Sequence, residues 1–320
     1  KAVASGAYML RLFLIRAYVK RKYTGLDYHA EPNDKALNQR NAALLHQVVG
    51  IIVNNTDVVM LTICLGRNSL LEVSVYGVYN LVVYAVNMLL TSFSNGLSAG
   101  FGEIISRGEK KALQESYSDY EYMYMIIFFI IIACMGILLL PFVSVYTIKM
   151  TDVNYVRPMA AFLFSVIVFW QNVRIPSMTI ISAAGHFRQT KRQAILEAVI
   201  NITISITLVW GLGMSGVLLG TVFSYGYRSL EMIFYTEKYL LPGTLKRSLS
   251  RIIRNALAVT ALIASGIYCI PQSMNSFVVW FLYAVTAGVV SAVVIVGINY
   301  LFEPEGFREL MERLKRIIKK

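Results

Sequence analysis

Asp57, Arg174, Glu197 and Arg228 are ionisable side chains that lie inside long apolar stretches of this sequence, where a charge is costly. A charge in a hydrocarbon layer costs about 3 kcal/mol on insertion scales and is retained where it is paired or faces water. Glu197 and Arg228 lie at matched depth on consecutive stretches, so we expect an intramembrane ion pair or anchors near a membrane surface. Asp57 and Arg174 lie deeper, so we expect them either to line a hydrated cavity or to be structurally paired.

Amides accompany the two deeper charges. Asp57 closes the run Asn54-Asn55-Thr56-Asp57, and Arg174 follows Gln171. Asn80 and Asn87 are seven residues apart, so they share a helix face and line the same cavity or bond a neighbouring helix. The candidates for a substrate cavity are therefore Arg174, Asp57, Asn54, Asn55, Asn80 and Gln171. This set is suited to binding.

Patterns for catalysis are missing from the sequence. No D-x-D motif, which glycosyltransferases use to hold a metal and a sugar nucleotide, occurs. The three cysteines fall in or at the end of apolar stretches, and the three histidines have no spacing that places two on one helix face. We therefore expect no enzyme, no metal site and no cofactor.

A glycine pattern at 211–216, GLGMSG, matches the dinucleotide-binding fingerprint in its letters. That motif must follow a strand and open a helix in a soluble domain, whereas here it joins two apolar stretches, so a turn is expected. Gly216 and Gly220 also form a small-xxx-small pair, which lets a neighbouring helix approach closely.

The elements that carry these residues are apolar stretches of roughly twenty residues, the length that a helix needs to cross a hydrocarbon layer about 30 Å thick. With 57% hydrophobic and 15% charged residues, the sequence predicts an all-α polytopic membrane protein. Nine spans are expected: Ala2–Val19, Leu44–Leu65, Val75–Phe101, Tyr124–Phe142, Met159–Ala184, Ala194–Gly211, Gly216–Tyr235, Ala256–Ile270 and Phe277–Leu301.

Basic residues fall mainly in every second loop, at 20–40, 102–121, 185–192 and 238–254, and in the C-terminal tail. Because positive charge is retained on the cytoplasmic side, we expect these loops and the C-terminus in the cytoplasm of a cell-membrane protein. The net charge of +12 does not lie on a face that could follow phosphates, so nucleic acid is not an expected partner.

The two ends of the chain carry further expectations. Nine spans with a cytoplasmic C-terminus place the first residue outside, and the chain begins with Lys1, so we expect that N-terminal helices are missing. The tail from Glu303 to Lys320 alternates apolar and basic residues at helical spacing, which predicts a basic amphipathic helix on an anionic leaflet. This helix anchors the chain or binds a partner.

Several short motifs then point to a family. They are NAALLHQVVGIIVNNTD (41–57), VYGVYN (75–80), PFVSVYT (141–147), TDVNY (151–155), RIP (174–176), AAGHF (183–187), EAVIN (197–201) and GVLLGT (216–221). They resemble bacterial polysaccharide-biosynthesis flippases of the multidrug/oligosaccharidyl-lipid/polysaccharide transporter superfamily. The resemblance covers the chain from Asn41 to about Arg228, and its motifs identify the family better than the cargo.

The resemblance implies a MATE-like, V-shaped fold of two six-helix lobes. Residues 1–22 are then the last helix of an otherwise missing first lobe and 23–43 the cytoplasmic loop between the lobes. Residues 44–240 form the six-helix second lobe, 252–302 two additional transmembrane helices, and 303–320 the basic tail. Half of a central site would be absent from this chain.

The implied function is to move an undecaprenyl-pyrophosphate-linked oligosaccharide across the cytoplasmic membrane, for capsule, exopolysaccharide or O-antigen. Arg174 is the expected cationic group for the pyrophosphate, and Asp57 with the amides bonds sugar hydroxyls or takes part in coupling to Na⁺ or H⁺. The lobes would rock about the connection near 25–35. The implied partners are membrane lipids, the lipid-linked substrate, a polysaccharide polymerase and glycosyltransferases.

Three alternatives stay open. A MATE-type ion-coupled drug or cation antiporter is favoured by the intramembrane acid Asp57. A membrane glycosyltransferase or polymerase is disfavoured by the missing acidic motif and by short outer loops. A non-transporting assembly factor is the third.

Overall fold

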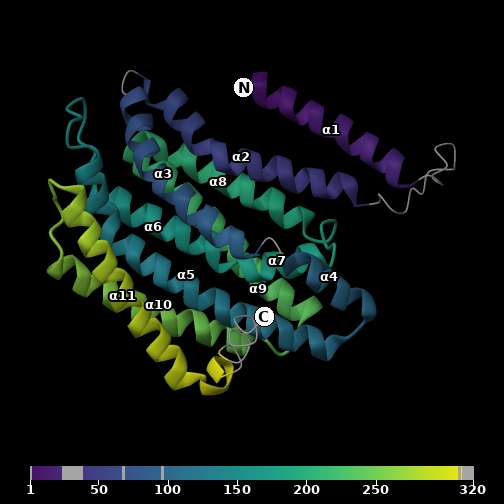
Figure 1. Cartoon of the computed structure of the whole chain (residues 1–320). Coiled ribbons are helices and arrows are strands. Elements are labelled where there is room, and N and C mark those ends of the chain that lie inside the picture. The colour runs from purple at the N-terminus through teal and green to yellow at the C-terminus, as the bar shows by residue number, and fades with distance from the viewer. Residues whose placement is uncertain (1, 24–38, 67–68, 95–96, 309–310, 312–320) are drawn as a thin grey trace. The chain divides into compact units, whose positions relative to one another are not determined.

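The computed structural model describes residues 2–23, 39–66, 69–94, 97–308 and 311 (Figure 1). Every regular element in these ranges is a helix, and they contain no strand. Two compact units are formed, Lys1–Arg40 and Asn41–Lys320. Most of the expected inter-lobe loop, including the proposed pivot, and most of the basic tail lie outside the described residues.

The first unit contains one helix, α1 (Ala2–Lys22). The second unit is a bundle of helices. These are α2 (Arg40–Cys64), α3 (Ser69–Ser94), α4 (Leu97–Arg107), α5 (Lys110–Tyr146), α6 (Pro158–Val173), α7 (Ile175–Ala183), α8 (Lys191–Leu212), α9 (Met214–Tyr235), the short π-helix η2 (Thr236–Leu240), α10 (Leu245–Cys269) and α11 (Phe277–Phe302). In Figure 1, α10 and α11 lie along α5, and both helices contact it.

Seven of the described helical segments are long and apolar enough to cross a membrane, so the chain is an all-α polytopic membrane protein. They are Arg40–Cys64, Ser69–Arg107, Lys110–Tyr146, Pro158–Ala183, Lys191–Leu212, Leu245–Cys269 and Phe277–Phe302. The other two expected spans form α1 and α9, which have 21 and 22 residues but fall outside this set. Helix α9 is largely buried by protein. Because protein groups can bond its polar side chains there, α9 does not need to be as apolar as a helix that faces lipid. The count of nine stays a prediction.

Two expected spans are not single helices. The span Val75–Phe101 is divided between α3 and α4, which begin and end at residues 69 and 107. The span Met159–Ala184 is divided between α6 and α7 at Arg174. Pro176 explains the second break, because it lacks an N–H and opens the first turn of α7.

Helix α5 is much longer than the expected span Tyr124–Phe142. Its 37 residues make it about 55 Å long, against a hydrocarbon layer about 30 Å thick. The first turns of α5 therefore extend beyond the layer at the end where α9 ends and α10 begins. Along its buried side, the rings of Tyr120, Tyr124 and Phe128 contact one another at four-residue spacing and form part of the core.

Helices α8 and α9 form the most extensive contact of the second unit. The turn between them is centred on Gly213, which has φ +56°, so the expected turn in GLGMSG is confirmed. A Cβ on Gly216 would lie 2.4 Å from the backbone oxygen of Leu208, and one on Gly220 would lie 2.2 Å from the Ser205 hydroxyl. The predicted close helix approach at this glycine pair is confirmed. It fixes α9 against α8, and both helices carry charged groups of the site below.

Candidate functional site

A cluster of two arginines and two glutamates lies in the interior of the second unit. Arg174 stands at the break between α6 and α7, Glu197 on α8, and Arg228 with Glu231 on α9. Nη1 of Arg174 donates to Oε1 of Glu197 at 2.7 Å, and Oε2 of Glu197 lies 3.6 Å from Nε of Arg228. Arg228 also pairs with Glu231, three residues along the same helix. Glu197 therefore bridges the two arginines.

The Arg228 side chain is only 2% exposed, and its Nε lies buried without a hydrogen-bond partner. The 3.6 Å to Glu197 is an ion pair but too long for a hydrogen bond. A buried donor without an acceptor costs about 1–3 kcal/mol, so this atom is available to an acceptor that enters the site.

These charges border a cavity of about 210 Å³ between α2, α6, α7, α8 and α9. Arg174, Glu197 and Arg228 line it together with His46, Asn54, Gln171 and Tyr225. The Arg174 guanidinium lies over the ring of Tyr225, 4.7 Å from its centre, and the Tyr225 hydroxyl donates to Oδ1 of Asn54 at 2.8 Å. The cavity thus presents cations, a carboxylate and amides in one place.

The helix break gives the cavity its local form. Arg174 lies between the end of α6 and the start of α7, where its ψ of −12° departs from that of a regular helix, and its side chain lines the cavity. Irregular backbone at membrane depth occurs where it is buried in protein or lines a cavity. The position of Arg174 agrees with that rule.

Asp57 forms a second polar cluster beside this cavity. Its carboxylate is 3% exposed and accepts from the Thr221 hydroxyl at 2.7 Å and from the Tyr76 hydroxyl at 3.2 Å. Asn201 donates to Thr221 at 3.0 Å, and its own Oδ1 is buried without a hydrogen-bond partner. No basic side chain of the described residues pairs with Asp57. Hydroxyls from α3 and α9 therefore bond an acid of α2 that has no cation beside it, and Asn201 of α8 supports one of these hydroxyls.

The amide candidates are only partly brought together. Asn54 and Gln171 line the cavity, whereas Asn55 is exposed and donates to the Ile51 carbonyl of its own helix. Asn80 is exposed and takes part in no hydrogen bond among the residues described. Asn87 instead donates to Gln171 at 2.8 Å, which joins α3 to α6.

Of the two roles expected for Asn80 and Asn87, bonding a neighbouring helix is seen for Asn87, whereas neither residue lines the cavity and Asn80 is exposed. Seven residues turn an α-helix by about 20° less than two full turns, so the second amide is displaced around the helix. Here that displacement places Asn87 at the edge of the packed side, while Asn80 stays on the outward side with Tyr84.

Several site residues were not foreseen. Tyr76, Asn201, Thr221 and Tyr225 supply hydroxyl and amide partners, and Glu231 pairs with Arg228. Glu231 had a usable signal, because it follows Arg228 by three residues and so lies on the same helix face. The tyrosines had none, since tyrosine is common both in packed interiors and near membrane surfaces.

A second buried charge network was also missed. Arg251, expected in a cytoplasmic loop, lies in α10 and is 3% exposed. It binds Glu121 of α5 and Glu303 at the end of α11, each at 2.9 Å. This network joins α5, α10 and α11 at the end opposite Gly213.

A scan of the chain against protein-family models gave no match, and a search of curated proteins gave no relative. The resemblance to polysaccharide flippases rests on the motifs quoted above and stays a prediction.

Proposed function

We propose that this chain belongs to a transporter that moves a lipid-linked oligosaccharide across the cytoplasmic membrane by alternating access. The chain supplies one wall of the transport path, with Arg174 and Arg228 facing the pyrophosphate and the amides facing the sugars. No bond of the substrate changes in this function. The cargo feeds the assembly of capsule, exopolysaccharide or O-antigen.

The observation that carries the proposal is the cavity at the α6–α7 break. It combines two arginines, one of them with a buried Nε that has no hydrogen-bond partner, and the amides of Asn54 and Gln171, inside a bundle of membrane helices. Charged groups within membrane segments are costly and typically line substrate or ion pathways. Guanidinium groups bind phosphate oxygens well because their N–H groups match that geometry.

Without substrate, the Glu197 carboxylate would occupy the arginine N–H groups that the pyrophosphate binds. In the described arrangement its carboxylate holds Arg174 at 2.7 Å and approaches Arg228. A pyrophosphate that enters the cavity competes for the same donors, so substrate binding would release Glu197 from Arg174. Such an exchange couples substrate binding to a change at the ion pair that joins the α6–α7 break to α8.

Asp57 is the proposed coupling group. Oxygen ligands from a carboxylate, hydroxyls and an amide suit a hard cation such as Na⁺, and protonation would neutralise the acid equally well. Because Thr221 and Asn201 lie on α9 and α8, a bound ion would alter the same two helices that carry Arg228 and Glu197.

The test is complementation of a flippase-null strain by the full-length protein with Arg174→Ala. We expect no complementation, while the variant still inserts at the normal level, because Glu197 keeps Arg228 as a partner. Arg188→Ala is the matched control, since Arg188 is exposed in the turn before α8. Undiminished complementation by Arg174→Ala would remove Arg174 from the site.

A drug or cation antiporter is the second candidate, and the buried Asp57 favours it. Resistance to drugs in a susceptible host, with unchanged surface glycan, would select this function. Turnover of a lipid-linked sugar by purified protein would instead select a glycosyltransferase or polymerase. Direct flipping by purified full-length protein in liposomes would exclude a non-transporting assembly factor.

A further inference from the structure

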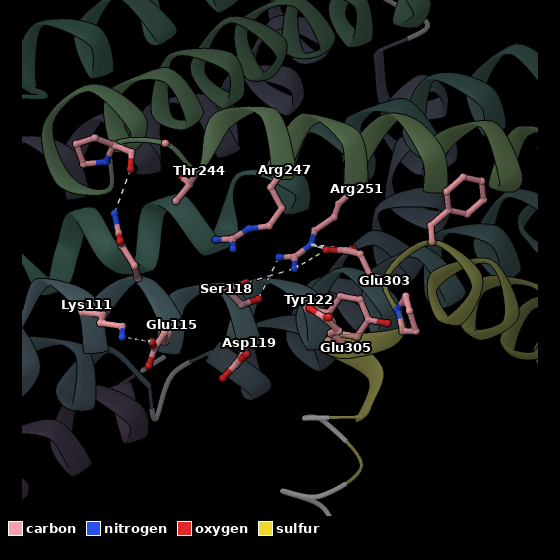
Figure 2. A pocket seen from close by; sticks show the side chains of 16 residues that line it. Lys111, Glu115, Ser118, Asp119, Tyr122, Thr244, Arg247, Arg251, Glu303 and Glu305 are labelled. Carbon is pink, nitrogen blue, oxygen red and sulfur yellow. Dashed lines mark hydrogen bonds and ion pairs between the residues drawn. The ribbon is translucent and has the colours of Figure 1, made fainter.

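A second cavity, of about 850 Å³, lies where α5 and α10 begin and α11 ends (Figure 2). It shares no lining residue with the cavity at Arg174. We call it the α5–α10 cavity. Its lining residues are Lys111, Gln114, Glu115, Ser118, Asp119, Tyr122, Pro242, Gly243, Thr244, Arg247, Arg251, Phe302, Glu303, Pro304, Glu305 and Gly306. Its volume lies within the range of about 300–1,000 Å³ that is usual for small-ligand sites.

The α5 wall is one face of the part of that helix that extends beyond the expected span. Its lining residues, from Lys111 to Tyr122, recur at steps of three and four, which places them in one row. The opposite wall is the turn before α10 and the first turns of α10. There, the backbone N–H groups of Gly243, Thr244 and Leu245 all donate to Glu237 at 2.8–2.9 Å. The N-terminus of α10 is therefore already capped from within the chain.

The two arginines of this wall differ in their partners. Arg251 is saturated by Glu121, Glu303 and Ser118. Arg247 extends into the cavity in Figure 2, and no hydrogen bond or ion pair of its side chain occurs among the residues that the structure describes. Its Nε is buried without an acceptor. A guanidinium without protein acceptors offers its N–H donors to a ligand.

Tyr122, in the α5 wall opposite Arg247, provides a second unpartnered donor. Its side chain is 2% exposed, and its hydroxyl is buried without a hydrogen-bond partner. Its ring is held in place by the Arg251 guanidinium, 5.2 Å from the ring centre. Because buried hydroxyls are normally satisfied, Tyr122 and Arg247 together indicate a ligand with oxygen acceptors.

Carboxylates also line the cavity. Glu115 and Asp119 lie on α5, below Arg247 in Figure 2, and Glu305 lies just after α11. Lys111 on the same helix face pairs with Glu115 at 4.0 Å, which leaves Glu305 as the carboxylate that can accept from a ligand. Glu305 forms no ion pair within the described part of the chain. A ligand that carried only negative charge would be repelled by this side, so the walls favour a phosphate joined to an ammonium group.

The surroundings of the cavity favour a lipid over a soluble ligand. Beside it, the last turn of α11 exposes Leu301 and Phe302 by 74% and 69%, and both follow a helix that is long and apolar enough to span a membrane. The cavity thus has a polar interior and an apolar edge at the end of three candidate spans. Phospholipid headgroups and their glycerol occupy that level of a bilayer.

We propose that the α5–α10 cavity binds the headgroup of an amine-bearing phospholipid of the phosphatidylethanolamine type. Arg247 and Tyr122 donate to the phosphate oxygens, and the carboxylate of Glu305 accepts from the ammonium group. The acyl chains leave past Leu301 and Phe302. These residues take no part in the transport site, so either proposal can fail without the other.

The test uses purified, delipidated full-length protein in detergent, with lipid binding followed by native mass spectrometry and by thermal stabilisation. Phosphatidylethanolamine should stabilise the protein, and Arg247→Ala should weaken its apparent affinity by about tenfold or more, as for a lost charge-assisted hydrogen bond. Tyr122→Phe, which removes only the hydroxyl, should weaken it by about two- to tenfold. Lys246→Ala is the control, because Lys246 is exposed and does not line the cavity.

Both variants are expected to fold, since Arg247 has no partner to lose and phenylalanine keeps the ring of Tyr122. An unchanged affinity in Arg247→Ala would overturn the proposal. Equal binding of phosphatidylglycerol, which lacks the ammonium group, would overturn the assignment of an amine-bearing headgroup. Equal binding of inorganic phosphate or of glycerophosphoethanolamine would show a soluble phosphate ligand and overturn the lipid assignment.

Discussion

Nη1 of Arg174 lies 2.7 Å from Oε1 of Glu197, at the point where the path of α6 is interrupted and α7 begins. Both side chains are about one-tenth exposed. The two residues differ in how many ion-pair partners they have. Glu197 also reaches Arg228, whereas no second carboxylate among the described residues pairs with Arg174. The two partners should therefore respond differently to substitution.

Glu197→Ala should destabilise the protein more than Arg174→Ala. The first change leaves Arg174 buried without a counter-ion and weakens the support of Arg228, and breaking a buried pair in this way costs about 3–5 kcal/mol. The second leaves Glu197 with Arg228. Thermal unfolding in detergent measures both. Equal melting temperatures for the two variants would show that Glu197 does not bridge the two arginines.

Asp57→Asn should preserve the fold and remove coupling. The asparagine oxygen still accepts from Thr221, and the amide nitrogen that replaces the other carboxylate oxygen donates to the Tyr76 hydroxyl instead of accepting from it. The group no longer binds a proton or a cation in the pH range of cells. Uptake or flipping in liposomes should then no longer respond to an imposed Na⁺ or pH gradient. The control is Asn55→Ala, because Asn55 is exposed and bonds only its own helix. A gradient response equal to that of the unchanged protein would exclude Asp57 as the coupling group.

Much of the helical framework follows from the sequence, because apolar length alone determines which segments can span a bilayer. The break at Arg174 was also foreseeable from Pro176, since proline removes a backbone donor. The length of α5 was not, because its first turns are amphipathic and extend outside the hydrocarbon layer, where hydropathy does not identify a helix.

The sequence was enough to identify the charged residues of the site, but not the residues with which they pair. The cost of an intramembrane charge made Arg174 and Glu197 visible in the sequence, yet their pairing depends on how α7 and α8 are rotated. The same rotation decides that Asn87 meets Gln171 while Asn80 faces outward. The spacing of residues in a sequence predicts which way a helix face points only to within tens of degrees. A hydrogen bond between two side chains requires their orientation to be known more accurately than that.

Acid should weaken the attachment of α11 through Glu303. Burial raises the pKa of Glu303, but hydrogen bonds from Arg251 and Arg254 outweigh it and hold the pKa below the usual 4.5. The folded state therefore binds this proton less readily than the unfolded state. The stabilisation is present above pH 4.5 and is lost as the pH falls through the folded-state pKa.

Glu303→Gln should lower the free energy of unfolding at neutral pH by about 1.5–3 kcal/mol and flatten the fall in melting temperature below pH 4.5. Glu103→Gln is the control, because Glu103 forms an exposed pair with Arg107 that contributes little. Melting curves between pH 7 and pH 3 measure the effect. A variant with the same acid dependence as the unchanged protein would show that Glu303 does not control it.

Gly216→Ala should separate α8 from α9 and disturb the charges that these helices carry. The added Cβ would lie 2.4 Å from the backbone oxygen of Leu208, and a backbone atom cannot move aside as a side chain can. We expect a loss of about 1–3 kcal/mol in stability, as for overpacking in a core. Gly77→Ala on α3 is the matched control, because nothing lies within 4 Å of its Cβ position and alanine favours a helix by about 0.5–1 kcal/mol. Thermal unfolding should therefore show opposite signs for the two substitutions, and a Gly216→Ala variant as stable as Gly77→Ala would contradict the close contact of α8 with α9.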